Sequence, residues 1–147
     1  WSSDVCSSDL SAKELYAILH LRNKVFVVEQ QCVYNDTDEK DLSCYHYSGY
    51  QNGTLVAYAR IVPPGLSYTE PRLGRIVTDP NIRRTGVGRA LMHRIIAVCG
   101  ELFPNKNIII SSQLYLIDFY ISFGFSPIGE PYPEDDIPHI EMLLKGS

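Results

Sequence analysis

Apolar residues recur at helical spacing in two stretches of the chain. In residues 87–102 they follow steps of four, four, three and four, which places one apolar stripe along a helix: Val87, Leu91, Ile95, Val98 and Leu102. An earlier helix is predicted to begin after Ser11, because Ser11 and Glu14 have the spacing of a capping box. That helix is expected to end near Glu29 and to turn one face toward a sheet: Leu15, Ile18 or Leu19, Arg22, and Val25 or Phe26.

Shorter apolar runs between turn signals predict the strands of a sheet. Residues 44–50 and 55–62 flank Asn52-Gly53, a dipeptide typical of tight hairpin turns, so these two strands are predicted to pair antiparallel. Further strands are predicted over residues 73–78, 108–112, 125–129 and 139–144, with a short helix over about 114–123 that ends at Gly124. Strands that alternate with helices after a hairpin predict a mixed α/β sheet. Its central neighbours are expected to be 73–78 and 108–112, and its closing strand 139–144.

Composition bounds the class of protein. With 147 residues, 45% of them hydrophobic, the chain has the size and apolar content of one domain with a single core. A net charge of −4 argues against general nucleic-acid binding, which needs a basic face. The four cysteines have no paired C-x-x-C spacing, so we expect reduced thiols and no metal site. No apolar run approaches the roughly 18 residues that span a bilayer, so we expect a cytoplasmic protein without membrane contacts.

The first ten residues do not share the pattern of the rest. Residues 1–10 nearly repeat the letters Ser-Ser-Asp and resemble translated adapter sequence, and they lack the charged and apolar regions of a targeting signal. We therefore expect residues 1–10 to be a non-native segment and residues 11–147 to form the domain.

A glycine-containing run between the predicted strand 73–78 and the helix 87–102 is the strongest functional signal. It consists of Arg83, Arg84, Thr85, Gly86, Val87 and Gly88, with Arg89 next to it. Glycines let backbone amides approach an anion, and the N-terminus of the following helix favours negative charge, so the run predicts a phosphate-binding loop. A P-loop would need Lys after Gly88, and a dinucleotide fingerprint would need a small residue at Leu91, so neither motif fits.

The run does match Arg/Gln-x-x-Gly-x-Gly/Ala, the acyl-CoA pyrophosphate loop, and here the chain resembles the GNAT superfamily of N-acetyltransferases. Residues 119–125 resemble the Tyr-x-x-x-Gly-Phe signature of that superfamily, at the expected distance after the loop. Other segments resemble its ElaA-like branch: residues 26–30, Tyr34, Asp36, Asp38, residues 57–60, residues 137–140 and Met142. The resemblance extends from about residue 11 to residue 144.

This resemblance implies a fold and an activity. The fold is a single-domain GNAT fold of the α/β class, a mixed central sheet flanked by helices, whose two central strands splay apart and hold a thioester between them. The activity is transfer of an acetyl group from acetyl-CoA to a primary amine of a small molecule or peptide, by direct attack in a ternary complex. A non-catalytic acyl-CoA-binding module and a nucleotide-binding module are the alternatives. The resemblance also implies a first, edge strand where residues 1–10 stand, so we expect that strand to be missing or replaced, and its loss would favour a homodimer.

The resemblance also implies roles for individual residues. The backbone of Ile76, Val77 and Thr78 is expected to pair with the pantetheine arm like an added strand. The amide of Gln113 stands where many members have an Asn that bonds the same arm. Tyr120 is the expected general acid, since a phenol is protonated at neutral pH. The general base stays open among four residues: Glu29, Asp38, His46 and His139.

Two acidic segments complete the sequence-based hypotheses. Residues 36–41 hold Asp36, Asp38, Glu39 and Asp41, and residues 134–136 are Glu-Asp-Asp. If both segments border one cleft, they are expected to attract a cationic amine. The alternative is that both are ordinary solvated loops.

Overall fold

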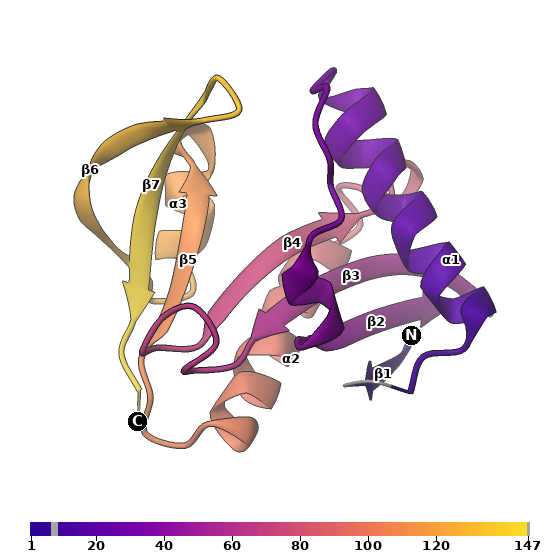
Figure 1. Ribbon diagram of the computed structural model, residues 1–147, viewed down its shortest axis with the longest axis horizontal. Helices are drawn as coiled ribbons and strands as arrows, with labels where there is room; N and C mark the ends of the chain where they lie inside the picture. The colour runs from indigo at the N-terminus through magenta and orange to yellow at the C-terminus, as the bar shows by residue number, and fades with distance from the viewer. Residues whose placement is uncertain (7–8, 147) are drawn as a thin grey trace.

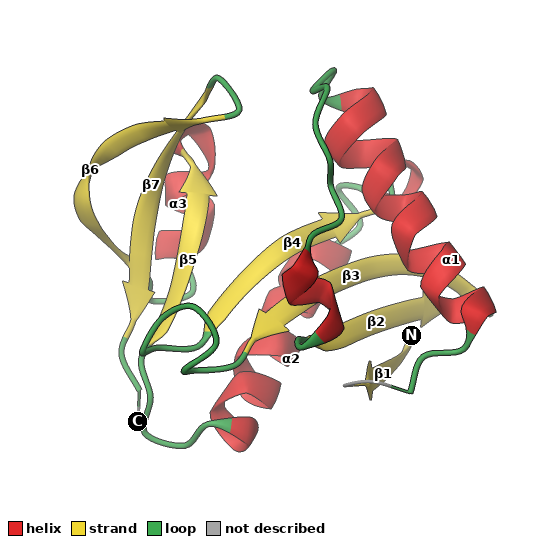
Figure 2. Cartoon of the chain, viewed as in Figure 1, coloured by secondary structure: helices red, strands yellow, loops and turns green. Residues whose placement is uncertain are grey.

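The computed structural model describes residues 1–6 and 9–146, which fold around a mixed sheet in the order β1-β2-β3-β4-β5-β7-β6 (Figure 1). The strands are β1 (Ser2–Cys6), β2 (Tyr45–Gln51), β3 (Thr54–Val62), β4 (Arg72–Thr78), β5 (Ile108–Gln113), β6 (Ser126–Glu134) and β7 (Ile137–Leu144). The α-helices are α1 (Ala12–Arg22), α2 (Val87–Leu102) and α3 (Ile117–Ile121). Shorter segments are a π-helix, η1 (Asn23–Glu29), and the 3₁₀ turns η2 (Glu39–Leu42), η3 (Pro80–Ile82) and η4 (Leu114–Leu116) (Figure 2).

Most elements form where local sequence signals predict them. Asn52 and Gly53 have positive φ angles of 53° and 78°, and they join β2 to β3 in a tight hairpin turn. The Ser11 capping box forms, with a 3.1 Å hydrogen bond from the Glu14 amide to the Ser11 hydroxyl. Gly124 follows α3 with a φ of 100°, the left-handed conformation expected at a helix end. These predictions are confirmed.

Two predicted details are wrong. Leu15 was expected on the buried face of the first helix, but it is 42% exposed, while Leu21 is buried. The buried positions of the helix are Ile18, Leu21, Arg22 and Val25, so the contact with the sheet begins after the first helical turn, which carries Leu15. Residues 23–29 continue as a π-helix. The strand expected to close the sheet, β7, lies between β5 and β6, because it pairs antiparallel with both and β6 takes the edge.

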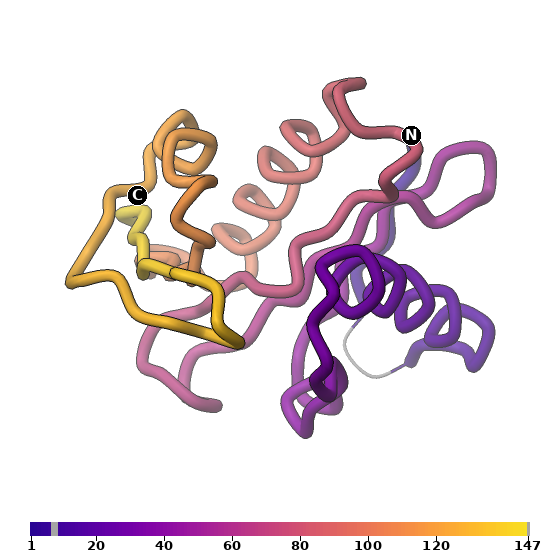
Figure 3. Tube along the Cα trace, turned by 90° about the horizontal axis from the view of Figure 1, so that it is seen from above, coloured from indigo at the N-terminus to yellow at the C-terminus, as the bar shows by residue number. Residues whose placement is uncertain are grey.

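Helices cover both faces of the sheet. Viewed from above, α2 and α3 lie on one face and α1 lies on the other (Figure 3). The larger core lies between the sheet and α2 and α3, and it contains Leu91, Ile95 and Ile110. A smaller core under α1 contains Ile18 and Tyr58. The stripe predicted for α2 is buried at its start, while Val98 and Leu102 are half-buried at its edge.

The sheet opens at its centre. β4 and β5 are parallel and pair only at Arg72–Ile109 and Leu73–Ile110, after which the two strands diverge (Figure 1). From Gly74 to Thr78, β4 pairs with β3 along one edge and with no strand of the described residues along the other. The splayed central strands implied by the family resemblance are therefore present.

The N-terminal residues occupy the edge of the sheet. β1 pairs antiparallel with β2, from Ser2 opposite Tyr50 to Cys6 opposite His46. The edge strand is therefore not missing, and its place is taken by residues of the segment 1–10. The four cysteines are free thiols, as their spacing predicted. Among the described residues, no helix is both long and apolar enough to cross a membrane.

Candidate functional site

A cleft of about 890 Å³ lies where β4 and β5 diverge. Its walls come from η1, the segment around η2, β3, β4, the start of α2, β5, α3 and the turn between β6 and β7. Ten of the residues predicted to bind the cofactor or to transfer protons line it: Glu29, Asp38, Ile76, Val77, Thr78, Arg83, Gly88, Gln113, Tyr120 and His139. The fold thus brings residues more than a hundred positions apart into one site.

The glycine loop forms an open helix N-terminus at this cleft. Gly86 is the N-cap of α2 with a φ of 86°, and no side chain caps the helix. The amides of the first turn therefore keep their hydrogen-bonding capacity for a ligand. A Cβ built on Gly88 meets no atom within 4 Å, so the folded chain itself leaves space there. An anion such as a diphosphate fits both features.

The free edge of β4 continues from this helix terminus. Ile76, Val77 and Thr78 line the cleft, and the side of β4 that faces β5 has no strand partner there. A bulge between Tyr58 and Arg60 separates the two parts of the β3–β4 ladder, and Arg75 beside it has a φ of 49°. An extended ligand arm has backbone groups to pair with along this edge.

Tyr120 projects from α3 into the cleft and is 7% exposed. Its ring packs edge-on against Phe119 and Phe125, at centroid distances of 5.2 Å and 6.1 Å. Burial, with a smaller contribution from Tyr115, raises the pKa of Tyr120 to about 12. The phenol therefore stays protonated at neutral pH.

His139 faces the cleft from β7, opposite Gln113 of β5. Its Nδ1 lies 2.7 Å from the Ile137 carbonyl oxygen, so Nδ1 carries a hydrogen and donates it. Its Nε2 lies 3.3 Å from Glu134 Oε2. A proton taken up at His139 Nε2 would therefore lie next to the Glu134 carboxylate.

Glu29, a second candidate base, is engaged by the glycine loop. Arg83 Nη1 and Nη2 donate to the two Glu29 carboxylate oxygens at 2.9 Å and 2.6 Å. The pair is exposed, with side chains 42% and 39% accessible, so its strength is limited by solvent. The residue expected to bind phosphate and the residue considered as a base thus contact each other directly.

Several predicted residues lie outside the lining of the cleft. Arg84, Thr85, Gly86 and Val87 shape the loop, and the Thr85 hydroxyl bonds the Ile82 carbonyl. Arg89 is drawn toward α3, where its Nη1 lies 3.1 Å from the Ser122 hydroxyl and its guanidinium stacks on Phe123. His46 is buried beside Tyr58 and does not border the cleft, so the structure does not place it as a base.

A buried ion-pair network beside the cleft was not predicted from the sequence. Arg22 is 1% exposed, and its Nε lies 2.7 Å from Asp36 Oδ2 while its Nη1 lies 2.9 Å from Asp41 Oδ1. Arg60 Nη1 lies 2.7 Å from Asp38 Oδ1 and 3.0 Å from Asp41 Oδ1. Arg75 Nε lies 2.9 Å from Asp36 Oδ1.

The network changes the meaning of the first acidic segment. Its three aspartates are balanced by three arginines, so the segment is neither a solvated loop nor a free anionic attractor. The sequence did contain a signal for this network: Arg22 stands on the predicted apolar face of a helix, and three aspartates follow within residues 36–41. Only Asp38 of the first segment, with Glu134 and Asp135 of the second, borders the cleft.

His46 and Tyr58 extend the network inward. The Asp41 carbonyl oxygen, 2.8 Å from His46 Nε2, can only accept, so Nε2 carries the hydrogen and Nδ1 accepts from the Tyr58 hydroxyl at 2.6 Å. Burial lowers the pKa of His46 from its usual value. This histidine is therefore a satisfied, neutral structural residue.

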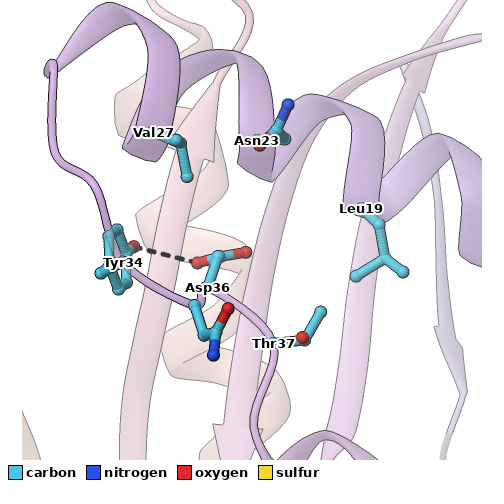
Figure 4. Close-up of a pocket in the computed structure, with 7 residues that line it drawn as sticks. Leu19, Asn23, Val27, Tyr34, Asp36 and Thr37 are labelled. Atoms are coloured by element: carbon cyan, nitrogen blue, oxygen red, sulfur yellow. Dashed lines mark hydrogen bonds between the residues drawn. The ribbon is translucent and has the colours of Figure 1, made fainter.

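A smaller cavity of about 280 Å³ lies between α1 with η1 and the segment that carries the aspartates. Figure 4 shows Tyr34 turned toward Asp36, with a hydrogen bond of 3.0 Å from the phenol to Oδ1. Tyr34 lines both cavities, so it lies between the smaller one and the main cleft.

The network predicts acid sensitivity through Asp41. Burial alone would raise the pKa of Asp41, but hydrogen bonds and charge from Arg22 outweigh it and lower the pKa from 3.8 to about 2. Because the folded pKa is depressed, ionised Asp41 stabilises the fold above about pH 4, by about 2 kcal/mol, and this contribution is lost as the pH falls toward 2.

Urea unfolding of the parent protein and of Asp41→Asn measures this contribution. At pH 7 we expect the variant to be less stable by about 2 kcal/mol, and near pH 2 we expect most of the difference to vanish. A difference that stays constant between the two pH values would contradict the assignment.

Comparison with known proteins agrees with this geometry. The family described as acetyltransferase (GNAT) domain matches residues 6–145. The chain is 43% identical over 141 residues to protein ElaA of Escherichia coli K12, covering 95% of this chain and 92% of ElaA. An acyl-CoA N-acyltransferase of Pseudomonas aeruginosa superposes with a TM-score of 0.93 at 37% identity, over 98% of this chain and 99% of that one. The crystal structure of Escherichia coli ElaA gives 0.92 at 39% identity, over 98% and 99%.

Proposed function

The chain belongs to the GNAT acetyltransferase family, and from that premise we propose that it transfers an acetyl group from acetyl-CoA to a primary amine in a ternary complex. The acceptor is an amine of a small molecule or peptide. The observation that carries the proposal is that two features border the same cleft: the unpaired edge of β4 and the uncapped N-terminus of α2. One suits a pantetheine arm and the other a pyrophosphate.

Residues suited to bind acetyl-CoA lie both at the N-terminus of α2 and beside the unpaired edge of β4. Arg83, with the amides of the first turn of α2, would bind the pyrophosphate, and Gly88 leaves room for its approach. The Gln113 side chain at the end of β5 would bond an amide of the pantetheine arm. Acetyl-CoA, once bound, supplies an activated acyl group, so the protein needs no nucleophile of its own.

Catalysis by this chain then consists of positioning and two proton transfers. His139 is the best placed of the candidate bases, because Nδ1–H is fixed by the Ile137 carbonyl while Nε2, beside Glu134, carries no hydrogen and can take a proton from the ammonium, directly or through water. Glu134 would stabilise the resulting imidazolium. Tyr120 donates its phenolic proton to the departing sulfur as the carbon–sulfur bond breaks.

Glu29 has a different place in this scheme. Because Arg83 already binds Glu29 through two hydrogen bonds, a pyrophosphate has to share or displace that carboxylate. We therefore assign Glu29 to the cofactor end of the cleft and not to the base.

Two measurements test the proposal directly. Calorimetry with coenzyme A measures binding to the folded protein, and thiol release in a panel of primary amines measures acetyl transfer. Binding together with amine-dependent thiol release supports an N-acetyltransferase. Binding without release from any amine would instead describe a non-catalytic acyl-CoA module, and a folded protein that does not bind coenzyme A would refute both.

Replacing Gly88 by alanine is expected to weaken coenzyme A binding without lowering the stability of the fold. The added methyl group has open space in the ligand-free chain and removes a helical glycine, so the free energy of unfolding should stay equal or rise by up to about 1 kcal/mol. Coenzyme A binding should weaken by about tenfold or more, because the methyl group occupies the approach to the helix terminus.

Gly100→Ala is the matched control. Gly100 belongs to the same helix, also has no atom within 4 Å of a built Cβ, and does not line the cleft. It should show the same effect on stability with unchanged coenzyme A affinity. Equal affinities for the Gly88 and Gly100 variants would argue against a pyrophosphate at this turn.

A further inference from the structure

Two arginines on one wall of the cleft have buried N–H groups that nothing in the described part of the protein binds. They are Arg60 of β3 and Arg72 of β4, and in each the Nε atom is buried without a hydrogen-bond partner. The Nε atom of Arg75 is also buried without a hydrogen bond, but it lies 2.9 Å from Asp36 Oδ1 and so has a charged partner. The Arg60 side chain is only 6% exposed, so bulk water has little access to it. A buried, unpaired donor costs free energy, so each guanidinium keeps hydrogen-bonding capacity that the described part of the chain does not use.

The sheet places these two side chains on the same face. Val62 of β3 lies opposite Arg72 of β4, and Arg60, two residues before Val62, points to the same side of β3. Arg60 and Arg72 are therefore diagonal neighbours, at a separation that long side chains bridge easily. Both line the cleft on the side of the sheet that carries α1.

Both guanidinium groups are fixed in place before any ligand arrives. Arg60 is held through Nη1 by Asp38 and Asp41, at 2.7 Å and 3.0 Å. Arg72 is held through Nη2 by Glu141 at 2.9 Å, and its guanidinium carbon lies 3.5 Å from the centroid of the Tyr68 ring. In each case one Nη atom is held and the other, Arg60 Nη2 or Arg72 Nη1, makes no hydrogen bond to a described residue, so an N–H group that is already ordered remains for a ligand.

The charged side chains that line the cleft are of both signs. Lys40, Arg60 and Arg72 are among the cations, and Lys40 makes no ion pair with a described residue but lies 5.7 Å from the Tyr68 ring. Glu134 and Asp135 are among the anions, and Glu134 Oε2 lies 3.3 Å from His139 Nε2. An acceptor that carries an ammonium group and an anion finds an oppositely charged partner for each of its charges.

We propose that the acceptor amine carries a carboxylate, which Arg60 and Arg72 bind while the amine faces His139 and Glu134. This inference rests on the proposed acetyl transfer and specifies its substrate class, an amino acid or a related amino carboxylate. A single negative charge suits the cleft better than a doubly charged phosphate, because Asp38, Glu134 and Asp135 already line it. Carboxylates also accept strong, charge-assisted hydrogen bonds from guanidinium N–H groups.

Matched acceptor pairs provide the test. Thiol release from acetyl-CoA is measured with a series of ω-amino carboxylates, from glycine to 6-aminohexanoate, each beside its carboxamide, and with 2-aminoethylphosphonate beside 3-aminopropanoate. For at least one chain length, kcat/KM for the carboxylate should exceed that for the carboxamide by about 10- to 100-fold. A preference for the phosphonate, or equal rates across all pairs, would overturn the carboxylate assignment.

Variants then locate the preference. Arg72→Gln should bring the carboxylate-to-carboxamide ratio close to one. Glu141→Gln breaks the same ion pair from its other side but leaves the arginine, so it should keep or increase the ratio. Arg94→Gln removes an exposed arginine of α2 and should keep the ratio. A similar fall of the ratio in the Arg72 and Glu141 variants would show that Arg72 has only a structural role.

The result also separates this inference from the proposed function. Acetylation of carboxylates and carboxamides at equal rates would retain the N-acetyltransferase and reject only the carboxylate site. If the folded protein binds coenzyme A but acetylates no member of any pair and no amine in the wider panel, the transferase proposal fails, and the carboxylate acceptor fails with it.

Discussion

Replacing Tyr120 by phenylalanine is expected to lower the rate of acetyl transfer by about 10²- to 10⁴-fold, the usual contribution of a general acid. The variant loses one hydroxyl group and keeps the ring that packs against Phe119 and Phe125, so the fold and the affinity for coenzyme A should change little. Steady-state thiol release measures the rate, and calorimetry with coenzyme A checks that binding persists.

The raised pKa of Tyr120 does not exclude this role. Burial raises the pKa of the phenol to about 12 because the cleft disfavours its anion. The same burial raises the pKa of a thiol that forms beside Tyr120, so it also favours transfer of the proton from the phenol oxygen to the sulfur. Tyr120 is protonated at every pH below about 11, and no loss of rate on the alkaline side of neutrality should originate from this residue.

Tyr115 provides the matched comparison. It also lines the cleft, and it is 76% exposed, so Tyr115→Phe removes a phenol from the same site without disturbing a core. We expect Tyr115→Phe to retain most of the rate. A loss in the Tyr115 variant, with an active Tyr120 variant, would reassign the acid.

The features that the sequence predicted well are those encoded by neighbouring residues. The hairpin turn at Asn52-Gly53, the capping box at Ser11 and the glycine at the start of α2 each depend on backbone preferences within a few positions. The glycine run 83–88 and Tyr120 could be singled out because they match local sequence motifs of the family. Their convergence on one cleft follows from the order of the strands.

The features that the sequence did not predict depend on side chains that meet across long separations. Arg83 and Glu29 are 54 positions apart, and nothing near either residue indicates their pairing. The π-helical turns of η1 arise where the chain packs beside the cleft, and helical periodicity alone does not distinguish them from an α-helix. The unpaired N–H groups of Arg60 and Arg72 likewise become visible only when burial and partners are known.

Arg22 shows one feature that the sequence predicted and one that it did not. Its position on the buried face of the first helix was predicted from the spacing of the apolar residues, and it is indeed 1% exposed. Its partners were not predicted: the aspartates at 36 and 41 lie 14 and 19 positions away, in a segment that could equally have been solvated. A charge within an apolar stripe was the signal that such partners must exist, because an unpaired buried guanidinium is too costly to retain.

Replacing Arg22 by methionine is therefore expected to reduce the free energy of unfolding by about 3–5 kcal/mol, because it leaves Asp36 and Asp41 buried without their shared cation. Urea or guanidinium unfolding at pH 7 measures the loss, with Arg94→Met as an exposed control that should cost little. Adding Asp41→Asn to the Arg22 variant should restore part of the stability, since the remaining Arg60–Asp38 and Arg75–Asp36 pairs then balance each other's charges. A loss below about 1 kcal/mol, or no recovery in the double variant, would mean that the network orders the segment beside the cleft without stabilising the fold.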